Sequence, residues 1–206
     1  ATIGYTTGMN LNKEALRYKG GSGTFMAFGN KYRGLPFEED TKIPNRFDNN
    51  PALTELTSSF NRQLAPTTFK SPLNGRFGIS KGNQINKEKV TIGYNTALNY
   101  SYEFRNYDEF EFGRSVKNES SQTELSQLQY AKGQRSEQEL QWSGMLGGAI
   151  KTNKSKYILN VLHSQNAVSR SAIYDLTFPN SQNTALPFKQ YVLDYSQRSV
   201  SNVLFS

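Results

Sequence analysis

Few side chains in this sequence have the types and spacing that catalysis or metal binding requires. The 206 residues include no cysteine and one histidine, His163, which excludes a thiolate site, a disulfide framework and a histidine-rich zinc or iron site. A single histidine without a second catalytic signal does not make a Ser–His–Asp triad, so we interpret His163 as a polar residue near a membrane boundary. The sequence therefore predicts no catalytic residue, no metal and no cofactor, and the protein is not expected to be an enzyme.

An acidic cluster and a glycine-rich run are weak signals for calcium binding and for phosphate binding, respectively. Asp108, Glu109 and Glu111 would offer the oxygen atoms that calcium prefers, but the spacing of an EF-hand loop is missing. A solvated, salt-bridged face is the better interpretation of this acidic cluster. The run GGSG at residues 20–23 lacks the spacing of a phosphate-binding P-loop and predicts a flexible loop.

Aromatic rings beside cations are the residue types here that best suit ligand binding. Rings stack on sugars and on aromatic ligands, and arginine grips anions through paired donors. These rings and cations lie in predicted long connections, so we expect any bound ligand to contact residues 17–73 and 106–118; packing of each loop on its own rings is the alternative explanation. The candidate substrate-binding residues are Phe25, Phe28, Tyr32, Arg33, Tyr107, Phe110 and Arg114.

The segment at residues 89–105 constrains the fold most strongly, because its side chains alternate without interruption between two chemical classes. At about 3.3 Å per residue it would span about 50 Å, enough to cross a membrane while tilted. In a membrane barrel the apolar set faces lipid and the small, polar set faces the lumen. The residues expected to face lipid are Val90, Ile92, Tyr94, Leu98, Tyr100 and Tyr102, with Trp142 on a later strand. The residues expected to face the lumen are Gly93, Asn95, Ala97 and Asn99.

The same alternation recurs in five further segments, so we predict an all-β protein with antiparallel strands. The six expected strands lie near residues 1–16, 74–82, 89–105, 139–151, 156–168 and 190–206. We expect residues 142–150 to pair with residues 157–163 through a tight turn at residues 152–155.

Long and short connections alternate along the chain, as expected for an outer-membrane barrel with long extracellular loops and short periplasmic turns. Residues 81–88 form a predicted short turn around Gly82 and Asn83, residue types that tolerate positive φ. The connection at residues 17–73 is rich in proline and predicts no strand. Residues 118–139 are expected to extend strands beyond the membrane, with a short amphipathic helix as the alternative.

Several segments resemble the TonB-dependent outer-membrane receptors, specifically the subgroup with a carboxypeptidase-regulatory-like N-terminal domain. The most specific block is residues 142–175, WSGMLGGAIKTNKSKYILNVLHSQNAVSRSAIYD. The other segments are GYTTGMNL, YKGGSGTFMAFGNKYRGLP, EFGR and YVLDYSQRSVSNVLFS. These are strand and loop sequences, so they indicate a lineage rather than a substrate.

The resemblance implies a barrel of about 22 strands with a plug in its lumen. Residues 1–206 would be one partial domain, about six strands from the early part of that barrel, without the plug. The implied function is energised uptake of a scarce solute across the Gram-negative outer membrane, driven by the TonB complex through other parts of the protein. Outer-membrane lipid and lipopolysaccharide are the expected surroundings, with a surface lipoprotein or a larger membrane complex as a further partner.

Other classes of protein compete with this interpretation. One is a non-transport outer-membrane barrel component of a larger complex, and another is a soluble all-β binding module, which would have shorter strands covered on both faces. The net charge of +7 permits an anionic partner, but no stripe of lysine and arginine or known motif indicates nucleic acid. Lipopolysaccharide phosphates are therefore the expected counterpart of this charge.

Overall fold

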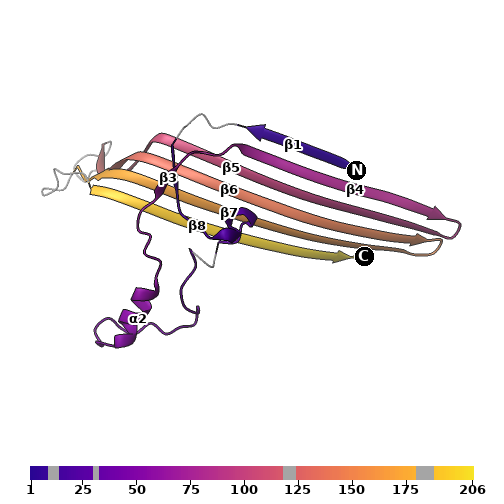
Figure 1. Cartoon of the computed structure of the whole chain (residues 1–206), viewed down its shortest axis with the longest axis horizontal. Helices are drawn as coiled ribbons and strands as arrows, with labels where there is room; N and C mark the ends of the chain where they lie inside the picture. The colour runs from indigo at the N-terminus through magenta and orange to yellow at the C-terminus, as the bar shows by residue number, and fades with distance from the viewer. Residues whose placement is uncertain (9–13, 30–32, 118–123, 180–187) are drawn as a thin grey trace.

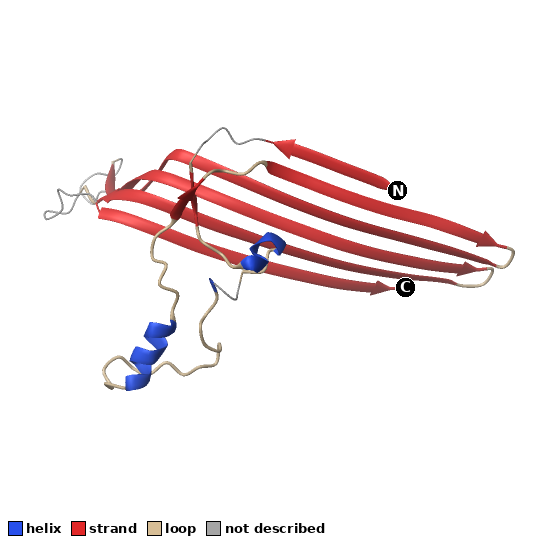
Figure 2. Ribbon diagram, in the orientation of Figure 1, coloured by secondary structure: helices blue, strands red, loops and turns tan. Residues whose placement is uncertain are grey.

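One large antiparallel sheet dominates the computed structural model, which describes residues 1–8, 14–29, 33–117, 124–179 and 188–206 (Figures 1 and 2). Six strands pair in the order β1-β4-β5-β6-β7-β8, which confirms the predicted antiparallel sheet. Their bounds are Thr2–Gly8 (β1), Asn74–Lys87 (β4), Val90–Lys117 (β5), Leu125–Thr152 (β6), Lys156–Thr177 (β7) and Phe188–Phe205 (β8). Within the described residues β1 and β8 are unpaired edges, so the sheet is open.

The central strands are much longer than the sequence analysis predicts. β5 and β6 each contain 28 residues, which is about 90 Å of extended chain. Most of residues 106–138, which separate two of the predicted strands, belongs to these two strands, in agreement with the expected strand extension. Register shifts between Tyr107 and Phe110 and between Arg114 and Ser115 mark irregularities in β5. Such bulges let a long strand bend while it keeps its partners.

Both tight turns lie at one end of the sheet, opposite the longer connections (Figure 1). The β6–β7 hairpin is confirmed: Ile150 pairs with Tyr157, and the Thr152 N–H donates to the Ser155 carbonyl at 2.8 Å. The predicted turn at Gly82 and Asn83 is wrong, because both residues lie inside β4 and pair with β5.

The β4–β5 turn is instead formed by the two residues after Lys87, which pairs with Val90. Extension of β4 places Ile85 opposite Ile92. Cross-strand pairs of β-branched residues stabilise a ladder. No glycine in the described part of the chain adopts a positive φ, so Gly82 does not need its conformational freedom here.

The long connection at residues 17–73 contains regular structure that the sequence analysis does not predict. β2 (Ala15–Arg17) pairs with β3 (Thr67–Phe69), and η1 (Ser22–Met26) and α2 (Pro51–Ser59) lie between them. The side chain of Asn50 accepts a hydrogen bond from the Ala52 N–H at 3.0 Å and so caps α2, with Pro51 at a favourable first position. The fold is therefore mostly β with one short α-helix. Among the described residues, no helix has the length and apolar character needed to cross a membrane.

The register of the sheet separates two faces, as predicted for residues 90–102. Residues 14–29, hereafter the docked segment, pack against the face that carries Tyr100 and Trp142, which we call the loop-bearing face. The opposite face carries Asn99 and Glu103, and we call it the charged face. A small core of Ala27, Leu140 and Ala167 lies between the docked segment and the sheet, and Leu16 of the docked segment is also buried. Closer to the tight turns, the apolar side chains of the loop-bearing face are exposed or partly exposed.

Candidate functional site

Side chains from four neighbouring strands fix the docked segment by hydrogen bonds to its backbone. The Tyr100 hydroxyl of β5 donates to the Phe25 carbonyl at 3.0 Å, and Trp142 Nε1 of β6 donates to the Met26 carbonyl at 2.9 Å. Gln165 Nε2 of β7 donates to the carbonyl of Ala27 at 3.0 Å. On β8, Gln197 accepts from the Gly29 N–H at 3.1 Å. Because these bonds satisfy backbone groups under the segment, they position it specifically.

A second group of contacts holds the start of the docked segment. The Leu16 N–H donates to Ser136 Oγ at 2.8 Å, and Asn106 Nδ2 donates to the carbonyl of Glu14 at 3.1 Å. Leu16 and Phe104 are both buried, and the ring of Phe104 meets that of Phe69, the partner of Ala15 in β3, edge to face at 5.2 Å. The docked segment is thus attached near both of its ends.

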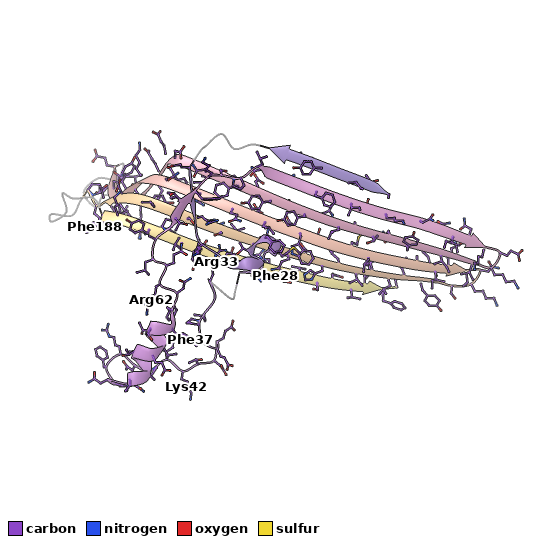
Figure 3. All side chains as sticks on the ribbon, viewed as in Figure 1. Phe28, Arg33, Phe37, Lys42, Arg62 and Phe188 are labelled. Carbon is purple, nitrogen blue, oxygen red and sulfur yellow. The ribbon has the colours of Figure 1, made fainter. Side chains whose placement is uncertain are left out.

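Arg33 is held within the loop rather than extended into solvent. Its guanidinium lies over the rings of Tyr18 and Tyr195, at 4.8 and 4.6 Å from their centroids. Nε donates to the Lys19 carbonyl at 3.3 Å, and Nη2 donates to the carbonyl of Tyr18. Burial lowers the pKa of Arg33, and the charge of Arg17 adds to this effect. Figure 3 shows Arg33 beside the sheet, close to Phe28 of the docked segment.

The seven predicted substrate-binding residues do not form a single site. Phe25 and Phe28 belong to the docked segment, where their side chains are 64% and 49% exposed, and Phe28 meets Trp142 edge to face at 6.4 Å. Tyr32 lies outside the described residues. Arg33 lies in the loop, as described above. The last three belong to β5, and its register places them on the charged face: Tyr107, Phe110 and Arg114.

Tyr107 and Phe110 belong to an aromatic cluster near the end of the sheet that carries the longer connections. Phe110 lies 6.3 Å from Tyr107 and 5.9 Å from Tyr174, measured between ring centroids. The guanidinium of Arg135 lies 4.7 Å from the Phe110 centroid. Rings and a cation are therefore combined on this face, as the sequence analysis expects for ligand contact, although Arg135 is the cation involved.

The predicted membrane-facing residues share the loop-bearing face, as their alternation requires. Of these, Val90, Ile92, Tyr94 and Leu98 lie nearer the tight turns than the hydrogen-bonded Tyr100 does. Tyr100, Tyr102 and Trp142 pack near the docked segment. This second packing role is absent from the sequence analysis, and the orientation of the whole set toward lipid stays a prediction.

A row of alternating charges on the charged face is the functional feature that sequence analysis misses. Arg105 contacts Glu139 at 2.9 Å and Glu103 at 3.1 Å. Arg170 bridges Glu137 at 3.3 Å and Asp194 at 2.9 Å. We call the whole set the charge belt: Arg76, Glu103, Arg105, Arg135, Glu137, Glu139, Arg170 and Asp194. The charges share one face only once the strands are in register, so no single segment reveals the belt.

A shallow hollow of about 360 Å³ adjoins the charge belt. Small and polar side chains dominate its lining, and Arg76 connects it to the belt. Polar lining residues on this face are Thr6, Asn99, Ser101, Gln141 and Ser143. The charged face can therefore contact polar or charged solutes.

The acidic cluster at residues 108–111 is occupied by protein donors. Asp108 accepts hydrogen bonds from Asn106 at 2.7 Å and from Gln134 at 3.2 Å. Glu111 pairs with Lys132 at 3.0 Å, and this hydrogen bond lowers the pKa of Glu111. Within the described ranges, no group of three or more histidine, aspartate or glutamate side chains could hold a metal ion.

His163 contacts a serine of β8 and the tryptophan of β6. Its Nδ1 lies 2.8 Å from Ser201 Oγ, and its ring centroid lies 5.0 Å from that of Trp142.

Comparison of the chain with protein-family models, curated proteins and solved structures finds no match. The chemistry of the two faces is therefore the basis for the functional inference.

Proposed function

We propose that this chain forms part of the wall of an outer-membrane β-barrel of about 22 strands that imports a scarce solute with energy supplied through TonB. The observation that carries the proposal is the chemical contrast between the two faces of one sheet. Near the tight turns the loop-bearing face exposes Ile92, Leu98, Leu146 and Val203, whereas the other face is small, polar and charged. Exposed apolar surface of this extent is unfavourable in water and is suited to lipid.

The length of the apolar region also supports a membrane-spanning role. From Val90 to Leu98 the strand covers about 30 Å, and a tilted transmembrane strand needs about 9–11 residues. Tyr100 and Trp142 follow at the end of this region, where barrels concentrate aromatic rings at the level of the lipid head groups. Beyond them, β5 to β8 would extend outside the membrane and support the docked segment.

The two open edges favour a larger closed sheet. β1 and β8 present unpaired backbone groups along their outer sides, and such groups are not tolerated in hydrocarbon. Additional strands of a barrel would pair with them. The charge belt and the polar hollow would then line the solute path, and the tight turns would lie on the periplasmic side.

Site-directed spin labelling tests the orientation of the sheet. Residues 1–206 contain no cysteine, so a cysteine introduced by Leu98→Cys or by Asn99→Cys is the only one in this region. Each variant of the full-length protein would be spin-labelled and placed in bilayers. We expect the label at position 98 to collide with oxygen, which concentrates in lipid, and the label at position 99 to collide with a water-soluble nickel chelate. Equal exposure of both labels to the nickel chelate would reject the membrane orientation.

Uptake by cells tests the transport activity. A strain that lacks the protein should grow poorly on one class of scarce nutrient in a panel of iron chelates, glycans and peptides, and re-expression should restore growth. Uptake of that nutrient over minutes should stop when a protonophore collapses the proton gradient. Lipid exposure at position 98 combined with normal growth on every nutrient would favour a barrel that is not a transporter.

A further inference from the structure

We propose that the docked segment, Arg33 and β5 form a binding site for a phosphate group of an outer-leaflet lipid. The site is a hollow of about 360 Å³ between the docked segment and the sheet. Three cations line it, Arg17, Lys19 and Arg33, together with Phe25 and the ring of Tyr100. The inference rests on the proposed function, because the membrane orientation places this hollow at the level of the lipid head groups.

Within the described residues no anion neutralises the positive charge of the hollow, although the guanidinium of Arg17 lies 5.0 Å from the centroid of the Phe69 ring. The hollow has no carboxylate among its lining residues, and none of its three cations forms a salt bridge in the part of the chain that the structure describes. Nη1 of Arg33 is buried without a hydrogen-bond partner. A buried donor without a partner costs free energy, which an anionic acceptor would recover. Guanidinium groups bind phosphate through paired hydrogen bonds, and lysine adds a point charge.

The backbone of the hollow is closely packed, in contrast to the flexible loop that the GGSG run predicts. A Cβ atom at position 20 would overlap the side chains of Thr24 and Arg33. Gly20 thus allows the guanidinium to approach the backbone closely, and the Thr24 hydroxyl donates to the carbonyl of Gly21 at 2.7 Å. These contacts hold Arg33 beside the other cations before any ligand binds, which reduces the entropic cost of binding.

The apolar surroundings favour a lipid over a free anion. Phe25 lines the hollow with its ring largely exposed, and Phe28 is exposed on the same segment. On the same face of the sheet, the exposed side chains of Ile92 and Leu98 continue toward the tight turns. An acyl chain could lie along these side chains while its head-group phosphate occupies the hollow. Inorganic phosphate would gain nothing from this apolar surface.

Native mass spectrometry of the full-length protein in detergent can measure the binding of lipid A, the phosphorylated lipid of lipopolysaccharide. We expect the double variant Arg17→Gln/Lys19→Gln to bind lipid A about tenfold more weakly, since it loses two charge-assisted contacts. The matched control is Lys42→Gln/Arg46→Gln, which also removes two positive charges from the connection at residues 17–73. Neither residue lines the hollow, and Figure 3 shows Lys42 near α2, away from Arg33. Lys19→Gln alone, a change of an exposed side chain, should weaken binding about threefold.

Several results would overturn the proposed site. These are unchanged binding by Arg17→Gln/Lys19→Gln, equal weakening in the control, or equal affinity for dephosphorylated lipid A. Displacement of lipid A by inorganic phosphate at equal concentration would identify a free-anion site instead of a lipid site. Failure of this inference is distinguishable from failure of the proposed function, because the spin label at position 98 would still report contact with lipid.

Discussion

The two faces of the sheet hold their side chains in place by different interactions. On the loop-bearing face, neutral donors such as Trp142 and Gln165 bind backbone carbonyls above a small apolar core. On the charged face, Arg105 and Arg170 bind carboxylates through partly exposed ion pairs. Salt screens exposed ion pairs strongly, but it has little effect on buried neutral hydrogen bonds. The contacts of the loop-bearing face are therefore expected to be insensitive to ionic strength, and those of the charged face are expected to weaken as salt is added.

The largest effect should come from the apolar core under the docked segment. Leu16 is 2% exposed, and Leu16→Ala should reduce the free energy of opening this segment by about 3 kcal/mol through the cavity that it leaves. Hydrogen exchange of residues 15–17 and 25–29 in the full-length protein would measure this change. Leu64→Ala in the same connection is the control, since Leu64 is 83% exposed. Equal exchange in both variants would show that the core does not hold the segment.

A smaller effect is expected from the neutral hydrogen bonds. Gln165 is 1% exposed, and Gln165→Leu should cost about 1.5 kcal/mol, because it removes the shorter of the two hydrogen bonds to the carbonyl of Ala27 and leaves the one from the Tyr195 hydroxyl at 3.4 Å. The exchange rate of residues 25–29 should rise by the same amount at low and at high salt. Gln141→Leu, on the opposite face, should leave these rates unchanged. A strong salt dependence in the Gln165 variant would contradict the proposed contrast between the faces.

Disruption of the charge belt should have a weaker, salt-dependent effect. Arg170→Gln removes the bridge between Glu137 and Asp194, and it should destabilise the β7–β8 pairing by about 1 kcal/mol at low salt. At 1 M salt, where the screening length is about 3 Å, the variant and the parent protein should exchange at similar rates. Arg198→Gln is the control, since Arg198 has no ion pair among the described contacts of the chain. A loss that persists at high salt would indicate packing rather than charge.

The smallest predicted effect is a pH dependence at Glu111. Its hydrogen bond with Lys132 lowers the pKa of this carboxyl from 4.5 in the folded state. The stabilisation is therefore present above the unfolded pKa and is lost as the pH falls through the lower folded value. Lys132→Gln should reduce this dependence in the exchange of residues 125–135, while the hydrogen bond with Tyr130 still favours the ionised carboxyl. An unchanged pH profile in the variant would show that Lys132 does not stabilise the ionised form.

Alternation along single strands predicted much of the sheet. The sets that contain Leu98 and Asn99 lie on opposite faces, and Ile150 pairs with Tyr157 as expected. These features follow from the two-residue period of a strand, which acts within one segment and needs no distant contact. The capped helix α2 was missed although Asn50 and Pro51 give a local signal, because the surrounding proline-rich connection was interpreted as irregular.

The tertiary structure alone determined how segments far apart in the chain combine. Gly82 and Asn83 have the composition of a turn, but continued pairing with β5 keeps them in a strand. Arg170 and Asp194 form part of the charge belt because neighbouring strands align their register. The position of the docked segment likewise depends on donors more than 70 residues away in the chain. The sequence by itself determined the faces of the strands and the β6–β7 hairpin, because side-chain alternation and a short polar turn are local. The end of β4, the charge belt and the position of the docked segment depend on pairing and packing between strands.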